Sequence, residues 1–269
     1  MDRTHQLGLL VCAIVMGSNL LAQDPHADPR TLAMAGATVS LAEGIHAVGY
    51  NPARLAYSTK DYSMNLGGMT FGALNNMLSV ENYNTMNGAD MINPNLKDGV
   101  EKEDFLALIP EEGWRLNTNL YLPLPGINWA RGTTAFSSEM IVYSDVGLPK
   151  AYMSLIMEGN PIGKTLNLDL AEEAIGVVEW GFSFAVPTET MAFGATIKYL
   201  QGLFYLGIDP DSSYGTFSTD LTGFAGDGRY LIRQAVGGGG IGLDLGFATA
   251  EFNGYQVGIS LINALGSIR

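Results

Sequence analysis

The chain has 269 residues and a mass of 28.7 kDa, enough for one or two domains with a sizeable core. Its formal charge is −13, from 14 Lys and Arg against 27 Asp and Glu, which excludes a general phosphate-backbone binder because polyanions would be repelled. Only 15% of the residues are charged and 47% are hydrophobic, which excludes extended disorder. The 34 glycines disfavour long helices and favour strands and turns.

Residues 1–23 predict a secretory signal peptide. Arg3 precedes an apolar core from Leu7 to Met16, which is too short to span a bilayer as a helix, and polar sequence begins at Asp24. The alternative for this stretch is a buried N-terminal helix. Cys12 is the only cysteine and lies inside the signal peptide, so a mature chain would hold no disulfide.

Residues 24–60 form a separate N-terminal segment in this interpretation, followed by a second unit over residues 61–269. The segment is rich in alanine and glycine, and such small residues allow a chain to pack closely against another part of the protein. Asn51-Pro52 signals a turn, and Pro52 is suited to begin a short helix.

From Asp61 onward the hydrophobic pattern has a period of two, which is typical of strands with one apolar face and one small or polar face. The apolar faces extend over roughly ten residues, which suits a strand tilted across a bilayer, and aromatic residues lie near their ends or along them. In a soluble sandwich these faces would point inward. The opposite faces carry few charges, as a crowded barrel lumen would. The alternating stretches are residues 62–67, 114–122, 178–186, 191–199, 240–247 and 255–261.

These patterns predict an all-β fold, an antiparallel transmembrane β-barrel. No stretch after Met16 has 18 consecutive apolar residues, and apart from helices only closed barrels satisfy every backbone group in lipid. The residues expected to face lipid are Trp180, Phe182, Phe184, Ile241, Leu243 and Leu245, and those expected to face the lumen are Gly181, Ser183, Gly242 and Asp244.

The predicted connections are short at one end and long at the other, as in outer-membrane barrels. Tight turns are expected at Pro187–Thr190 and at Asn253-Gly254. Residues 82–113 and 207–228 are expected to be long loops. Two stretches, 102–109 and 149–158, have the spacing of short helical insertions.

Two glycine patterns resemble nucleotide-binding motifs without meeting their requirements. Residues 159–165 have three residues between their glycines where a phosphate loop needs four, and a predicted helix precedes them instead of a strand. Gly237, Gly239 and Gly242 match a dinucleotide-binding pattern, but an alternating strand follows where a helix is required. These glycines are instead expected to let the strand bend or another segment approach it.

The sequence gives equally little support for a metal site or a catalytic site. His26 and His46 are the histidines that remain after residue 23, so neither a His/Cys metal site nor a Ser–His–Asp set is expected. Asp209, Asp211 and Ser213 lie close enough in sequence to bind calcium, with a solvated loop as the alternative. We therefore expect no enzyme, no catalytic residue, no metal and no cofactor.

Residues 31–56, TLAMAGATVSLAEGIHAVGYNPARLA, resemble the N-terminus of FadL/PorV-type bacterial outer-membrane β-barrels. Those proteins begin with an Ala/Gly-rich stretch, an acidic-Gly pair and then Asn-Pro-Ala. The corresponding residues of this hatch motif are Gly36, Glu43, Gly44, Asn51, Pro52 and Ala53. Residues 152–202, 223–228 and 242–246 resemble an uncharacterised branch of the same superfamily, known only as a domain of unknown function.

The resemblance implies a barrel in the outer membrane of a Gram-negative-type envelope, with residues 24–60 folded into its lumen as a hatch. The FadL group passes hydrophobic substrates and the PorV group serves protein secretion. The leading hypothesis is passive transport of small molecules, hydrophobic ones among them; the alternatives are a scaffold or shuttle in secretion or surface assembly, and a soluble exported β-rich binding protein. The expected partners are outer-membrane lipid and either a small hydrophobic ligand or secretion-machinery proteins, with no nucleic acid.

The length of the chain limits the size of the barrel. After the hatch, residues 61–269 leave room for about 8–10 strands with their connections, and the family's barrels are larger. The sequence ends at Gly266–Arg269, directly after a predicted strand and without the terminal aromatic that such barrels carry. We therefore expect the sequence to be truncated at its C-terminus.

Overall fold

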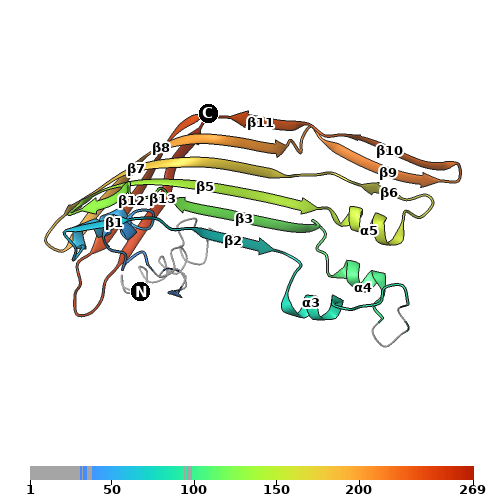
Figure 1. The fold of residues 1–269 in the computed structure, drawn as a ribbon, viewed down its shortest axis with the longest axis horizontal. Helices are drawn as coiled ribbons and strands as arrows, with labels where there is room; N and C mark the ends of the chain where they lie inside the picture. The colour runs from blue at the N-terminus through green and yellow to red at the C-terminus, as the bar shows by residue number, and fades with distance from the viewer. Residues whose placement is uncertain (1–30, 32, 35–37, 94, 96–98) are drawn as a thin grey trace, which may run out of the picture.

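The computed structural model describes residues 31, 33–34, 38–93, 95 and 99–269, and this part of the chain is mostly antiparallel β-sheet (Figure 1). It holds two short 3-10 helices, η1 (Gly44–Ala47) and η2 (Pro52–Tyr57), and three α-helices, α3 (Val80–Met86), α4 (Lys102–Ala107) and α5 (Lys150–Glu158). Its strands are β1 (Tyr62–Asn65), β2 (Thr70–Asn75), β3 (Trp114–Pro123), β4 (Asn128–Arg131), β5 (Thr134–Leu148), β6 (Thr165–Asn167), β7 (Glu173–Pro187), β8 (Met191–Ile208), β9 (Tyr214–Asp220), β10 (Gly223–Arg229), β11 (Ile232–Val236), β12 (Gly239–Thr249) and β13 (Gly258–Ile268).

Ten of these strands form one sheet, in the order β1-β4-β5-β7-β8-β12-β13. Strand β5 is long enough to pair with two strands on one side: β4 lies along Thr134–Phe136 and β3 along Glu139–Leu148, with β2 beside β3. In the same way β8 pairs with two strands on one side: β12 lies along Met191–Gln201 and β11 along Phe204–Ile208. A second, three-stranded sheet has the order β10-β9-β6.

The two ends of the main sheet are built differently (Figure 1). At one end the strands are joined by tight turns, and η1 and η2 lie against the sheet there. At the other end the chain forms what we call the platform, residues 76–93, 95, 99–113, 149–172 and 209–231, which holds the three α-helices and the three-stranded sheet. Short connections therefore gather at the end that carries the hatch segment.

The two faces of the main sheet differ sharply. The face that contacts η2, here the inner face, buries small and polar side chains: Ser183, Thr196 and Asp244 have no exposed surface. The opposite, outer face exposes large apolar side chains, among them Phe182 at 47%, Ile197 at 58% and Ile241 at 71%. A soluble sheet has the reverse arrangement, with its apolar face in the core.

Several local predictions are confirmed. The helices expected at 102–109 and 149–158 are α4 and α5. Thr188–Thr190 turns the chain between β7 and β8, and Asn253-Gly254, both with positive φ, turns it between β12 and β13. Each turn joins two strands that pair with one another.

Other local predictions are wrong in detail. Residues 207–228 are not a loop but the end of β8 and the hairpin of β9 and β10. The last strand begins at Gly258, not at residue 255, because residues 252–255 close the preceding turn. Strand β5 was not predicted, because it has no clear period of two: Ser137, Ser138 and Glu139 are all buried in succession.

The main sheet is open among the described residues. Strand β13 pairs only with β12, β1 only with β4 and β2 only with β3, so no recorded ladder joins the first strands to the last. Residues 1–23, the predicted signal peptide, lie outside the described residues. Within the described residues, no helix has both the length and the apolar character needed to cross a membrane.

Candidate functional site

The hatch motif lies on the inner face, at the end of the sheet with short turns. Asn51 is fully buried and caps η2: its side-chain oxygen accepts the Ala53 N–H at 3.1 Å. Its side-chain nitrogen donates to the carbonyls of Val39, at 3.0 Å, and Phe247, at 2.9 Å. One side chain thus connects three chain segments, two of the hatch and one of β12.

Glycines of the sheet make room for this motif. A Cβ built at Gly194 would overlap the backbone nitrogen of Ala53, and a Cβ at Gly246 would lie 2.9 Å from that nitrogen and overlap the Asn51 side-chain oxygen. Ala53, Ala192 and Ala248 form a fully buried cluster around the contact. The backbone of η2 therefore rests directly on the backbone of β8 and β12, an approach that larger residues would block.

The other residues of the hatch motif are held on the same side. The Glu43 carboxylate accepts a hydrogen bond from the Thr59 hydroxyl at 3.0 Å, and Gly44 has a φ of +55° that glycine adopts without strain. Arg54 is 3% exposed, donates to the Ala42 carbonyl at 3.3 Å and lies over the Tyr57 ring. Burial lowers the pKa of the Arg54 guanidinium, and the nearby charge of Glu43 opposes that shift. Gly36 lies outside the described residues.

A buried ion-pair network lies farther along the inner face. The Lys198 ammonium contacts Glu179 at 2.9 Å and Asp244 at 2.8 Å, and it donates to the Asn263 side chain at 3.3 Å. Asp244 also accepts the Asn263 N–H at 2.7 Å, at the irregularity where the β12–β13 register shifts. Because the lysine comes from β8 and its carboxylates from β7 and β12, the network ties three strands together.

The residues predicted to face lipid and lumen separate between the two faces. Phe182, Phe184, Ile241 and Leu245 are exposed on the outer face, and Trp180 and Leu243 are half-buried there. Gly181, Ser183, Gly242 and Asp244 are buried on the inner face.

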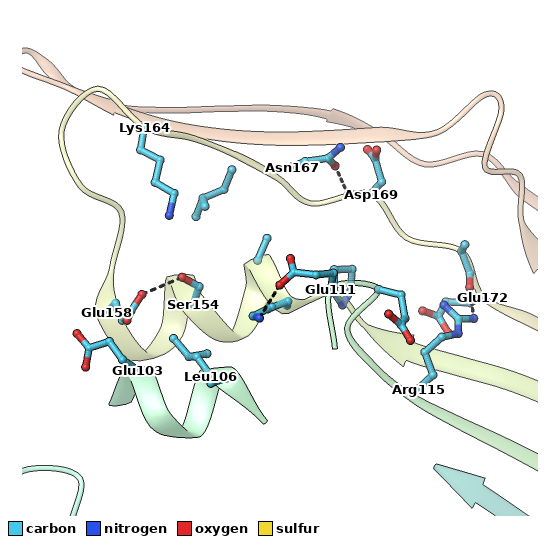
Figure 2. Close-up of a pocket in the computed structure, with 17 residues that line it drawn as sticks. Glu103, Leu106, Glu111, Arg115, Ser154, Glu158, Lys164, Asn167, Asp169 and Glu172 are labelled. Carbon is cyan, nitrogen blue, oxygen red and sulfur yellow. Dashed lines mark hydrogen bonds and ion pairs between the residues drawn. The ribbon is translucent and has the colours of Figure 1, made fainter. Parts of the chain in front are cut away.

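A cavity of about 770 Å³ lies in the platform, between α5 and the segment from Lys164 to Glu172 (Figure 2). Helix α4 closes one side, and the Arg115 side chain stands near Glu172 at one end (Figure 2). A small core of Met77, Phe105, Leu106 and Ile109 holds α4 in place, with methionines packed around it. Sequence reasoning missed this cavity, because its walls come from three segments far apart in the chain.

Hydrogen bonds hold the cavity walls together. The Lys102 ammonium donates to the Met157 carbonyl at 2.7 Å, which joins α4 to α5. The hydroxyls of Tyr152 and Tyr230 lie 3.0 Å apart, and Tyr230 donates to the Leu168 carbonyl at 2.9 Å, which joins α5 to the opposite wall. Burial and this hydroxyl contact raise the pKa of Tyr152 to about 12, so its hydroxyl stays protonated at neutral pH.

The weak motifs have structural roles. The loop 159–165 follows α5 and is held against β9: Gly163 N–H donates to the Thr219 carbonyl at 2.7 Å, and the Asn160 side chain donates to the Lys164 carbonyl at 2.9 Å. At the glycine run 237–239, a Cβ built on Gly202 would lie 2.8 Å from the Gly237 carbonyl, so β8 and the run approach closely.

The residues considered for calcium are engaged in protein contacts. Asp209 pairs with Arg233, and the Ser213 hydroxyl accepts the Leu231 N–H at 2.9 Å. In the part of the chain that the structure describes, no group of three or more His, Cys, Asp or Glu side chains is arranged to hold a metal ion.

Residues 52–269 match the family model described as Family of unknown function (DUF5723). The match begins inside the hatch motif, at Pro52, and continues to the last residue of the sequence. No curated protein and no solved structure matches the chain. The resemblance to the FadL and PorV groups remains a prediction.

Proposed function

The chain belongs to DUF5723, a family of unknown function, and we propose that it is a FadL/PorV-like outer-membrane β-barrel protein with a lumenal hatch. In this proposal the outer face contacts lipid, the inner face lines the lumen and residues 24–60 fill one end. The protein passes small molecules, hydrophobic ones among them, across the outer membrane.

The observation that carries the proposal is the inverted distribution of side chains over the main sheet. Cross-strand rows of the outer face are apolar, such as Phe182, Ile197 and Leu243, which lie opposite one another on β7, β8 and β12. The inner face buries Lys198, Asp244 and Glu179 instead. Water on the outer face would leave this apolar surface without a partner, whereas lipid would cover it at no cost.

The extent of the apolar band supports the same proposal. On β8, alternate residues from Met191 to Tyr199 point outward over nine positions, and a tilted strand crosses the hydrocarbon core of a bilayer in about 9–11 residues. Trp180 and Tyr199 lie opposite each other at one limit of the band, and the Trp180 indole donates to Gln201 at 3.2 Å. Aromatic side chains with a polar group suit such a boundary.

A specific observation also favours the second candidate, a scaffold or shuttle in secretion or surface assembly. The backbone contact of η2 with β8 and β12 leaves no space between them, since Cβ atoms at Gly194 and Gly246 would overlap η2 or the Asn51 side chain that caps it. A passage that is permanently filled would not transport. The helices and the extra sheet of the platform would then present a binding surface to other proteins.

The membrane placement is tested by introducing a charge into the outer face. In Ile197→Arg a charge replaces a side chain within the apolar band, which should cost up to about 2–4 kcal/mol in lipid and reduce the membrane-integrated fraction after urea extraction. The matched control is Ile162→Arg, a similarly exposed isoleucine on the platform, which should leave that fraction unchanged. A wild-type chain that is soluble without detergent would favour the soluble binding protein. An Ile197→Arg variant that is more soluble than the wild type would favour it too.

The two membrane functions are then separated in vesicles and in cells. If the protein transports, vesicles that contain it should take up Nile red, an apolar dye, faster than empty vesicles. In both cases the dye is trapped by a binding phase enclosed inside the vesicles. A scaffold predicts no acceleration and a stable partner recovered by cross-linking in intact envelopes. Equal uptake by loaded and empty vesicles would reject the transport proposal.

A further inference from the structure

The platform cavity has no part in the proposed transport or plug function, and it combines features that point to a ligand. Its walls are held before any ligand arrives by the Lys102–Met157 contact and by the bonds of Tyr230 to Tyr152 and Leu168. Its volume of about 770 Å³ is within the range of small-molecule sites. A preformed site of this size loses little ordering entropy on binding.

The lining of the cavity carries more carboxylates than cations. Six carboxylates line it, those of Glu103, Glu111, Glu112, Glu158, Asp169 and Glu172, against the cations of Arg115, Lys150 and Lys164. Arg115 already pairs with Asp145 at 2.8 Å and donates to the Ala171 carbonyl, and Lys150 pairs with Glu111 at 2.9 Å. Glu103, Glu112, Glu158 and Asp169 make no ion pair among the described residues, although Glu158 and Asp169 each accept a hydrogen bond, so the lining keeps an excess of negative charge.

The remainder of the lining is aliphatic apart from Ser154 and Asn167. Leu106, Ala107, Pro149, Ala151, Leu166 and Ala171 contribute to the lining between the acidic side chains. Burial raises the pKa of the Glu172 carboxyl, and the Gly147 N–H and the nearby charge of Arg115 oppose that shift. Apolar surface interleaved with carboxylates suits a ligand that alternates methylene groups with charged nitrogens.

The Lys164 side chain is itself a chain of methylene groups that ends in a charged nitrogen. It extends from the wall opposite α5 into the space above the helix (Figure 2). Among the described residues its ammonium makes no ion pair or hydrogen bond, so no fixed contact within the protein places it there. The cavity thus already accommodates an ammonium group on a four-carbon chain.

We propose that the platform cavity binds an aliphatic oligoamine, a ligand that carries several ammonium groups on a flexible chain. The source is either a free polyamine or the lysine side chains of a peptide, since both present the same chemistry. The proposal does not depend on the membrane placement, because binding is measured on the purified full chain in detergent micelles.

The test is calorimetric titration with spermidine, with trilysine and with butylamine, which carries a single ammonium. We expect spermidine or trilysine to bind and butylamine to bind much more weakly, because one charge engages one wall only. Binding should weaken as the salt rises to about 150 mM, since the acidic side chains are partly exposed. Preference for spermidine assigns a free polyamine, and preference for trilysine assigns a peptide.

Matched variants separate the cavity from the general negative charge of the chain. Glu103→Gln with Glu158→Gln should weaken binding about five- to tenfold, as expected for two exposed ion pairs. Glu189→Gln with Glu251→Gln removes the same charge from exposed positions at the hatch end and should change nothing. Lys164→Met should strengthen binding about two- to threefold, because it removes a competing ammonium.

The opposite signs of these variants make the proposal falsifiable even if one of them folds poorly. Failure of both oligoamines to bind the wild-type chain would overturn it. So would equal weakening by the two double variants, which would mean attraction to the overall charge of −13 only. Failure of the membrane test with retained oligoamine binding would reject the proposed function and leave this inference standing.

Discussion

The hatch end and the platform end pack by opposite means. At the hatch end the contact is backbone against backbone. Gly194 and Gly246 carry no side chain, which allows Ala53 to lie directly against the sheet. At the platform end Phe105 and Ile109 are surrounded by Met86, Met91, Met153 and Met157, which are flexible and fill irregular spaces. A contact without side chains has one geometry, whereas a methionine-rich core adjusts to several.

The difference matters for what each end is able to do. A rigid contact that buries Asn51 completely suits a plug that stays in place. The platform suits a surface that binds, because hydrogen bonds between its walls hold a cavity open, and its methionine-rich core tolerates substitution without unfolding the sheet. Substitutions of the same kind at the two ends should therefore have unequal consequences, and three pairs of variants measure them.

The largest difference is expected for two lysines. Lys198→Met removes the cation between Glu179 and Asp244 and leaves both carboxylates buried without it, which should lower the free energy of unfolding by about 3–5 kcal/mol. Lys164→Met, on the platform, removes an exposed ammonium that pairs with nothing among the described residues and should stay within about 0.5 kcal/mol of wild type. Urea unfolding in micelles measures both, and similar midpoints would contradict the prediction.

A smaller difference is expected for two strand glycines. Gly194→Ala places a methyl group against the Ala53 backbone and should cost about 1–3 kcal/mol by forcing η2 away from the sheet. Gly226→Ala, in β10 of the platform, meets its nearest atom at 3.7 Å and should be neutral. Displacement of η2 would expose Arg54, so trypsin should cleave after Arg54 in Gly194→Ala only. Resistance of both variants to trypsin would mean that the hatch contact tolerates a methyl group.

The smallest difference is expected for two asparagines that each hold several chain segments. Asn51→Ala leaves the carbonyls of Val39 and Phe247 without this hydrogen-bond donor and should lower the free energy of unfolding by about 1–2 kcal/mol. Asn160→Ala, on the platform, should cost less, because water replaces its bonds to Lys164 and Thr219. Thermal unfolding compares them. Unchanged Nile red uptake in Asn51→Ala would assign this residue to fastening the hatch, whereas altered uptake at wild-type stability would give it a part in transport.

The sequence predicted the elements whose pattern depends on neighbours along the chain. The period of two marked β7, β8 and β12, where outward apolar and inward small residues alternate, and Asn253-Gly254 marked its turn because both positions need positive φ. It failed at β5, where three consecutive polar residues are buried, because burial there depends on what covers each face and not on periodicity. It also took the β9–β10 hairpin for a loop, since Gly223–Arg229 is exposed throughout and lacks an alternating face.

By itself, then, the sequence determined the β-rich class, the opposed character of the two strand faces and the turn at Asn51-Pro52, since these depend on residue types at fixed local spacings. The partners of those residues were decided by the tertiary structure alone. Asn51 meets Phe247 across 196 positions of sequence, and Lys198 meets Asn263 across 65. The platform cavity likewise exists only where α4, α5 and the Lys164–Glu172 segment converge, because long-range strand pairing, which no local pattern encodes, brings these connections to the same end of the sheet.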